Sequence, residues 1–131
     1  MRGTVCRDIG GAMSAGPAIL VVEDEPLISM MLEDFLDALG YRLAGAVDDV
    51  SEALRHVEAG GFDAALLDVN LRDGETSWPI ADALSQRGHP FVLATGGGND
   101  AVPERHAGVP VLSKPYTLDG VREAFETLLS N

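Results

Sequence analysis

The feature that most constrains the fold is a regular alternation of short apolar runs with stretches of helical periodicity, which begins at Ala18. The first run, Ala18 to Val22, is continuously apolar and rich in β-branched residues, as expected for a strand that is buried on both faces. Strand and helix patterns alternate five times, which predicts right-handed crossovers and a parallel sheet with helices on both faces. The predicted strands are Ala18–Val22, Tyr41–Val47, Asp63–Leu67, Phe91–Ala94 and Val109–Leu112.

Local patterns mark where the helices between these strands begin. Pro26 suits the first turn of a helix, and Ser77 and Thr117 stand where capping residues are expected. The stretch between the fourth and fifth strands is different, because it contains three consecutive glycines and Pro103, which are poor helix formers. We therefore expect the fourth helix to be short or mobile.

The length of the chain, 131 residues, suits one domain with a hydrophobic core. The first seventeen residues are rich in Gly, Ala and Ser and show no hydrophobic periodicity. We interpret residues 1–17 as a flexible N-terminal tail and residues 18–131 as the single folded domain.

Charge and cysteine content argue against several partners and locations. Nine basic residues against 21 acidic ones give a formal net charge of −12, whereas nucleic acids and anionic membranes attract clustered Lys and Arg. The single cysteine, Cys6, cannot form an internal disulfide, and no apolar run reaches the roughly 18 residues of a membrane span. We therefore expect a cytoplasmic protein without nucleic-acid or membrane partners.

Polar residues suited to bind a cation or a phosphate follow four of the predicted strands at their carboxyl ends, the edge where open parallel sheets bind ligands. They are Glu23 and Asp24 after the first strand, Asp68 and Asn70 after the third, Thr95 after the fourth and Lys114 after the fifth. Carboxylates in one cleft repel one another unless a cation neutralises them, and oxygen ligands suit Mg²⁺. We expect Asp24 and Asp68 to be direct Mg²⁺ ligands. Glu23 would act through water and Asn70 through its backbone carbonyl.

A carboxylate beside Mg²⁺, a hydroxyl and a lysine is equipped for phosphoryl transfer. Asp68 would attack phosphorus as a nucleophile, while Mg²⁺ balances the charge of the transferring group. The hydroxyl of Thr95 and the ammonium of Lys114 would hold the phosphoryl oxygens.

Four motifs stand in order at strand ends: Glu23-Asp24, Asp68, Thr95 and Lys114-Pro115. Together they resemble the receiver domain of bacterial two-component response regulators, over about residues 18–131. The resemblance implies a flavodoxin-like strand order, 2-1-3-4-5, and a protein that is not an enzyme. It implies that Asp68 accepts a phosphoryl group from a sensor histidine kinase or a histidine phosphotransfer protein. It also implies that Thr95 is the switch hydroxyl and that Lys114 pairs with the phosphoryl group.

Departures from the receiver pattern concern the switch rather than phosphoryl acceptance. The family often has an aromatic residue three positions before the lysine, where this chain has Val111, and a proline four positions after the aspartate, where it has Arg72. The fourth strand resembles a subgroup of stand-alone receivers that read Pro-Phe-x-Phe-Ala-Thr-Gly-Tyr, from which Leu93 and Gly97 differ. We expect Asp68 to be phosphorylated as in the family. We expect the phosphorylated state to be transmitted by a route other than the usual switch between the threonine and the aromatic residue.

We predict a single-domain response regulator that signals through phosphorylation-controlled binding of a partner protein, or that acts as a phosphate shuttle or sink. One alternative is a pseudo-receiver that binds partners without phosphorylation. Another is a Mg²⁺-dependent phosphatase of the haloacid dehalogenase type, whose nucleophile follows the first strand, where this chain has Asp24. None of the histidines, His56, His89 and His106, is placed beside the acidic residues, and we expect all three to lie on the surface.

Overall fold

The computed structural model describes residues 16–71, 76–95, 102–113 and 116–129. Within them five strands form one sheet in the order β3-β2-β4-β5-β6, and each neighbouring pair is parallel. Because β2 is the first of these strands along the chain, numbering them from one gives the order 2-1-3-4-5. This is the predicted flavodoxin-like order, so the fold prediction is confirmed. The strands are β2 (Ala18–Val22), β3 (Arg42–Val47), β4 (Ala64–Asp68), β5 (Phe91–Thr95) and β6 (Val111–Ser113).

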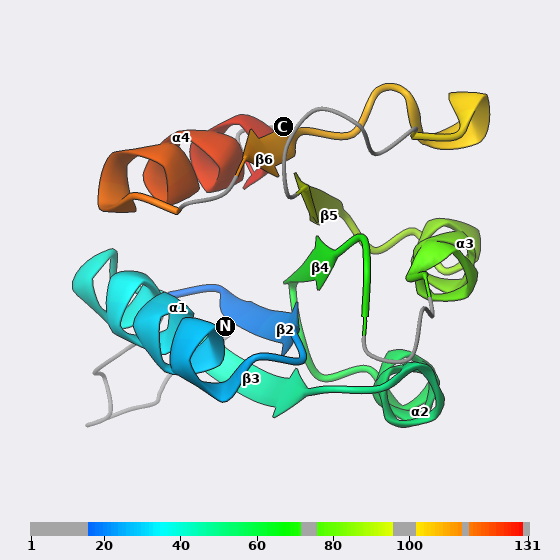
Figure 1. Cartoon of the computed structure of the whole chain (residues 1–131), viewed down its shortest axis with the longest axis horizontal. Coiled ribbons are helices and arrows are strands. Elements are labelled where there is room, and N and C mark those ends of the chain that lie inside the picture. Colours follow the sequence, from blue (N-terminus) through cyan, green and yellow to red (C-terminus); the bar gives the residue numbers. More distant parts are fainter. Residues whose placement is uncertain (1–15, 72–75, 96–101, 114–115, 130–131) are drawn as a thin grey trace, which may run out of the picture.

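The helical segments are α1 (Pro26–Ala38), α2 (Val50–Ala59), α3 (Trp78–Gln86), the short 3₁₀ helix η3 (Glu104–His106) and α4 (Leu118–Leu129). Two of them cover each face of the sheet: α1 and α4 lie on one face, and α2 and α3 lie on the other (Figure 1). Across the described ranges, no helix combines the length and the apolar character that crossing a membrane requires.

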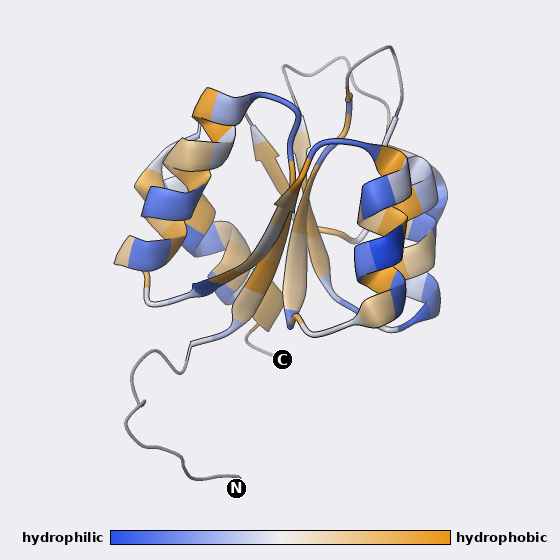
Figure 2. Cartoon of the chain, turned by 90° about the horizontal axis from the view of Figure 1, so that it is seen from below, coloured by the Kyte–Doolittle hydropathy of each residue, from blue (hydrophilic) through white to orange (hydrophobic). Residues whose placement is uncertain are grey.

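The side chains of β2, β4 and β5 alternate between two apolar layers. In β2, Leu20 and Val22 pack toward α2 and α3, whereas Ile19 and Val21 pack toward α1 and α4. Every residue of β2, β4 and β5 is buried, which explains why these runs are apolar up to the polar residues Asp68 and Thr95 that end β4 and β5. Figure 2 shows the apolar strands at the centre, with hydrophilic residues on the outer sides of the helices.

Side chains at the helix starts meet the sequence expectations to different degrees. Thr117 behaves as predicted, because its Oγ1 accepts from the backbone N of Gly120 at 2.9 Å. Asp49 caps α2 in the same way, accepting from the backbone N of Glu52 at 2.7 Å. Ser77 occupies the N-cap of α3 but makes no capping hydrogen bond with its side chain.

The described part of the segment between β5 and β6, residues 102–110, contains little helix, as predicted. Its described residues form only the single 3₁₀ turn η3, and the mobility of this segment stays a prediction. Strand β6 begins at Val111 rather than at the predicted Val109. The physical reason is Pro110, which has no N–H to donate to the ladder, although its carbonyl accepts from the N–H of Leu93 at 3.0 Å.

The expectation of three surface histidines is wrong for His106, which is 3% exposed, while the other two are half-buried. The ring of His106 contacts the rings of Trp78 and Phe91, with centroids 6.1 and 5.6 Å away. It also bonds to a carboxylate of α3, Asp82. Two aromatic neighbours and a charged partner offset the cost of burying an imidazole.

The first described residues, Gly16 and Pro17, are attached to the sheet although they end the predicted tail. The backbone N of Arg42 donates to the carbonyl of Pro17 at 2.8 Å, and its Nε donates to the carbonyl of Gly16 at 3.0 Å. The rest of the predicted tail, residues 1–15, lies outside the described residues.

Candidate functional site

The carboxyl ends of β2 and β4 bring three acidic side chains together. The last residue of β2, Val22, pairs with Leu67 of β4. Asp68 therefore ends its strand beside Glu23 and Asp24. One carboxylate oxygen from each of these three residues lies within 4.8 Å of the other two. Glu23 and Asp68 are each 3% exposed, whereas Asp24 is half-buried.

Backbone hydrogen bonds fix the two buried carboxylates. The backbone N of Glu25 donates to Oε2 of Glu23 at 3.1 Å, and the backbone N of Glu23 donates to the carbonyl of Val47 at 3.0 Å. The backbone N of Asn70 donates to Oδ1 of Asp68 at 3.4 Å. Each carboxylate is thus held by the turn that directly follows its own strand.

The electrostatics of this acidic cluster (Glu23, Asp24 and Asp68) favour a cation. Three carboxylates this close repel one another, and two of them are largely removed from water, which is costly without a compensating charge. All the available donors are oxygen atoms, which suit a hard divalent cation such as Mg²⁺. A surface pocket of about 260 Å³ opens beside the cluster, between the ends of β2 and β3 and the first turns of α1 and α2. The residues present therefore fit a Mg²⁺ site.

Thr95 and Asn70 reach the same edge of the sheet. Thr95 is the last residue of β5 and is 6% exposed. Ala94, the residue before it, pairs with Asp68, so Thr95 stands one position beyond the acidic cluster on the neighbouring strand. Asn70 lies two residues after Asp68, with its side chain exposed and its backbone bridged to Thr76.

The sequence reasoning missed Tyr116, which is 5% exposed and whose hydroxyl donates to Oε1 of Glu23 at 3.4 Å. Burial raises the pKa of Tyr116 above its usual range, and the negative charges of Glu23 and Asp68 raise it further, so the hydroxyl keeps its proton. Tyr116 follows Lys114 by two residues, but nothing in this local spacing indicates its contact with a residue 93 positions earlier. Lys114 itself lies outside the described residues.

A second acidic group lies nearby, at the start of α2, and one of its carboxylates caps that helix. Asp48, Asp49 and Glu52 also bring carboxylate oxygens within 4.8 Å of one another. None of the three is buried, and the carboxylate of Asp49 already caps the helix. This group therefore lacks the buried carboxylates that make the first cluster a candidate site.

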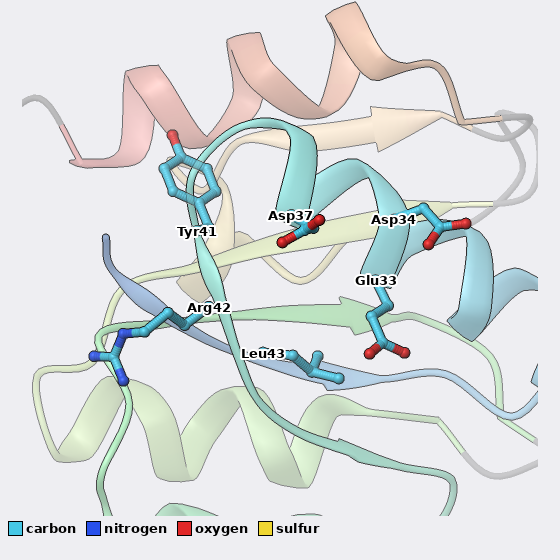
Figure 3. A pocket seen from close by; sticks show the side chains of 6 residues that line it. All are labelled: Glu33, Asp34, Asp37, Tyr41, Arg42 and Leu43. Atoms are coloured by element: carbon cyan, nitrogen blue, oxygen red, sulfur yellow. The ribbon is translucent and has the colours of Figure 1, made fainter. Parts of the chain in front are cut away.

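A larger pocket, of about 450 Å³, lies beside the carboxyl-terminal half of α1 (Figure 3). It lies toward the amino ends of the strands, because Arg42 at the start of β3 pairs with Ala18 at the start of β2. The side chains of Tyr41 and Arg42 point to different sides, and the acidic residues are exposed. Since parallel sheets bind their ligands at the opposite edge, we do not assign it a function. Its lining residues are Glu33, Asp34, Asp37, Tyr41, Arg42 and Leu43.

Comparison with known families decides what kind of domain carries this site. A family model described as the response regulator receiver domain matches residues 19–126. The chain belongs to the response regulator receiver domain family. Receiver domains of this family work in two-component signalling systems, and they bind Mg²⁺ at an acidic pocket of the kind that Glu23, Asp24 and Asp68 form.

Two solved structures and one curated protein illustrate what this receiver resembles. SdrG from Sphingomonas melonis Fr1 is 59% identical, with a TM-score of 0.79 over 89% of this chain and 99% of that chain. The BeF3-activated conformation of SdrG, from Pseudomonas melonis Fr1, is also 59% identical over the same shares, with a TM-score of 0.75. The transcriptional regulatory protein TcrA of Mycobacterium tuberculosis is 34% identical over 112 residues, which are 80% of this chain. The match covers 43% of TcrA, less than half of that regulator.

Proposed function

We propose that this receiver accepts a phosphoryl group on the carboxylate of Asp68 from a sensor histidine kinase or a histidine phosphotransfer protein. The observation that carries the proposal is the place of Asp68, buried at the end of a central strand with oxygens of Glu23 and Asp24 within 4.8 Å. SdrG, which this chain resembles, has a BeF3-activated conformation. Since BeF3 mimics a phosphoryl group, this similarity supports phosphoryl acceptance here.

In the proposed transfer, a carboxylate oxygen of Asp68 forms a bond to phosphorus while the bond from phosphorus to the donor histidine nitrogen breaks. The electron pair of the broken bond stays on the imidazole ring, which takes up a proton and leaves as neutral histidine. The product is an aspartyl phosphate, and neither an oxidant nor water is consumed.

The acidic cluster is proposed to hold Mg²⁺ during this step. Asp24 and Asp68 serve as direct ligands, and Glu23 acts through a water molecule. Asn70 adds its backbone carbonyl, and its N–H already bonds to the side chain of Asp68. When bound, Mg²⁺ offsets the negative charge of the carboxylates and of the phosphoryl group.

Thr95 and Lys114 are proposed to bind the phosphoryl oxygens, the first by a hydrogen bond and the second by its charge. The position of Thr95 next to Ala94, the strand partner of Asp68, supports this role. The position of the usual aromatic switch holds Val111, whose side chain is 51% exposed. We therefore propose that a partner protein reads the phosphorylated state through a change at Thr95 and the segment after it.

The test is intact-mass spectrometry of the full chain after incubation with acetyl phosphate and Mg²⁺. Wild type is expected to gain the mass of one phosphoryl group, and Asp68→Asn is expected to gain none. Asp37→Asn, which alters an exposed carboxylate of α1, is the matched control and should keep the wild-type gain. Labelling that survives Asp68→Asn would contradict the assignment of the acceptor.

This measurement, together with assays of kinase-dependent labelling, ester hydrolysis and onward transfer, separates the other functions. If wild type gains no mass, either from acetyl phosphate or from a phosphorylated kinase, the pseudo-receiver is favoured. Steady hydrolysis of phosphate esters that requires Asp24 rather than Asp68 favours the phosphatase. Onward passage of the label to a histidine phosphotransfer protein identifies a phosphate shuttle.

A further inference from the structure

Tyr116 links the acidic cluster to the segment between β6 and α4. Its ring belongs to the apolar layer beneath α1 and α4. Its hydroxyl reaches Oε1 of Glu23, a residue 93 positions earlier in the chain. This contact joins residues that follow β2 and β6, two strands with β4 and β5 between them in the sheet.

Glu23 accepts a hydrogen bond on each of its two carboxylate oxygens. Oε1 accepts from the hydroxyl of Tyr116 at 3.4 Å, and Oε2 accepts from the backbone N of Glu25 at 3.1 Å. Two donors on different oxygens fix the orientation of the carboxylate plane and of its remaining lone pairs. Because Glu23 is only 3% exposed, bulk water does not readily replace a lost donor.

Divalent cations differ in how much they depend on such a fixed carboxylate. Mg²⁺ requires near-ideal octahedral geometry, whereas Ca²⁺ tolerates irregular geometry and bidentate carboxylates. Groups that orient the residues around a metal commonly change its affinity by roughly 10- to 100-fold. A donor that fixes one carboxylate of a cluster therefore affects Mg²⁺ more than Ca²⁺.

We propose that Tyr116 is a positioning residue that holds Glu23 and thereby makes the acidic cluster select Mg²⁺ over Ca²⁺. The inference rests on the Mg²⁺ site of the proposed function. Tyr116 acts through Glu23 and contacts neither the cation nor the phosphoryl group in this role. Without the hydroxyl, the Glu23 carboxylate turns more freely. It then holds the water ligand of an octahedral Mg²⁺ less well, and it can make the direct bidentate contacts that suit Ca²⁺.

Isothermal titration calorimetry of the full chain with MgCl₂ and CaCl₂, without a phosphoryl donor, tests the inference. Tyr116→Phe keeps the ring and is expected to weaken Mg²⁺ binding roughly tenfold, with a much smaller effect on Ca²⁺. Tyr41→Phe is the matched control, because Tyr41 is the other tyrosine of the chain and packs against the same apolar layer, 5.8 Å from the ring of Phe125. The control should bind both cations as wild type does.

A double-mutant comparison separates positioning from general damage to the fold. In a Glu23→Gln background, Tyr116→Phe is expected to change Mg²⁺ binding by less than about twofold, because the carboxylate it positions is gone. In labelling with acetyl phosphate, Tyr116→Phe should raise the half-saturating Mg²⁺ concentration about tenfold. The labelling rate at saturating Mg²⁺ should stay near that of wild type.

Several results would overturn the positioning role. The first is an Mg²⁺ affinity of Tyr116→Phe that is unchanged or tighter, and the second is an equal loss of Mg²⁺ and Ca²⁺ affinity in that variant. The third is a Glu23→Gln protein that keeps the wild-type preference for Mg²⁺, which overturns the role even if Tyr116→Phe proves unstable. A wild type that binds Mg²⁺ but is not labelled overturns the proposed function alone, and a wild type that binds no Mg²⁺ overturns both.

Discussion

Nε2 of His106 lies 2.8 Å from Oδ1 of Asp82, and this contact ties η3 to α3. Arg105 donates to the same carboxylate, from Nε to Oδ1 at 2.7 Å and from a terminal nitrogen to Oδ2 at 3.2 Å. The imidazole ring stacks on Trp78 and meets Phe91 edge-on. The turn η3 is therefore held to α3 by the carboxylate of Asp82 and the ring of Trp78, and to β5 by the ring of Phe91.

His106→Ala is expected to lower the free energy of unfolding by about 2–3 kcal/mol, because it removes a buried ring from between aromatic neighbours and leaves a cavity. Urea unfolding curves measure the difference from wild type. Arg55→Gln, which breaks an exposed ion pair with Glu52, is the control and should leave the unfolding curve unchanged. A His106→Ala protein as stable as this control would show that these contacts add nothing to the fold.

The stability that Asp82 contributes should be lost in acid. The hydrogen bond from Arg105, and then that with His106, lowers the pKa of Asp82 below its usual value of 3.8. A carboxyl group with a lowered folded pKa stabilises the fold above its unfolded pKa, and this contribution disappears as the pH falls through the folded value. The difference in free energy of unfolding between wild type and Asp82→Asn should thus be larger at about pH 5 than below about pH 4, where it shrinks. An equal difference at about pH 3 and about pH 6 would contradict this account.

The sheet and the acidic cluster were predictable from the sequence because both follow from the strand pattern. A continuous β-branched run such as Ala18–Val22 is stable only when both faces are covered, which requires helices on each side of a parallel sheet. Parallel strands end at one common edge, so Glu23, Asp24 and Asp68 were expected to meet there, and they do. The roles assigned to them stay predictions.

The residues that the sequence did not reveal depend on contacts between distant side chains. His106 is buried because Asp82, 24 residues earlier, and two aromatic rings surround it, whereas a histidine in a glycine-rich stretch is usually exposed. Tyr116 reaches Glu23 across 93 positions, and local periodicity carries no information about such a pair. Strand ends can be placed from sequence patterns, but the partners of single polar side chains cannot.

Ser77 should tolerate replacement by alanine, unlike most helix-capping residues. Its side chain is fully buried, and its Oγ has no hydrogen-bond partner among the residues that the structure describes. Removing an unpaired buried hydroxyl is expected to leave the free energy of unfolding unchanged or to raise it by up to about 1 kcal/mol. Thr117→Ala removes the capping hydrogen bond that the backbone N of Gly120 donates to Thr117. This variant should instead lower the free energy of unfolding by about 1 kcal/mol. Similar losses for both variants in urea unfolding would show that Ser77 has a polar partner.

We propose that the folded unit starts at Gly16 rather than at Ala18. A protein that begins at Gly16 should unfold at the same temperature as the full chain. Removing Gly16 and Pro17 as well should cost about 1–2 kcal/mol, because Arg42 then loses the acceptors of its backbone N and its Nε. Arg42→Gln, which loses only the side-chain bond to Gly16, should lie between the two truncated proteins in thermal unfolding. If the shorter protein is as stable as the longer one, the contacts of Arg42 with this segment do not stabilise the sheet, and the unit starts at β2.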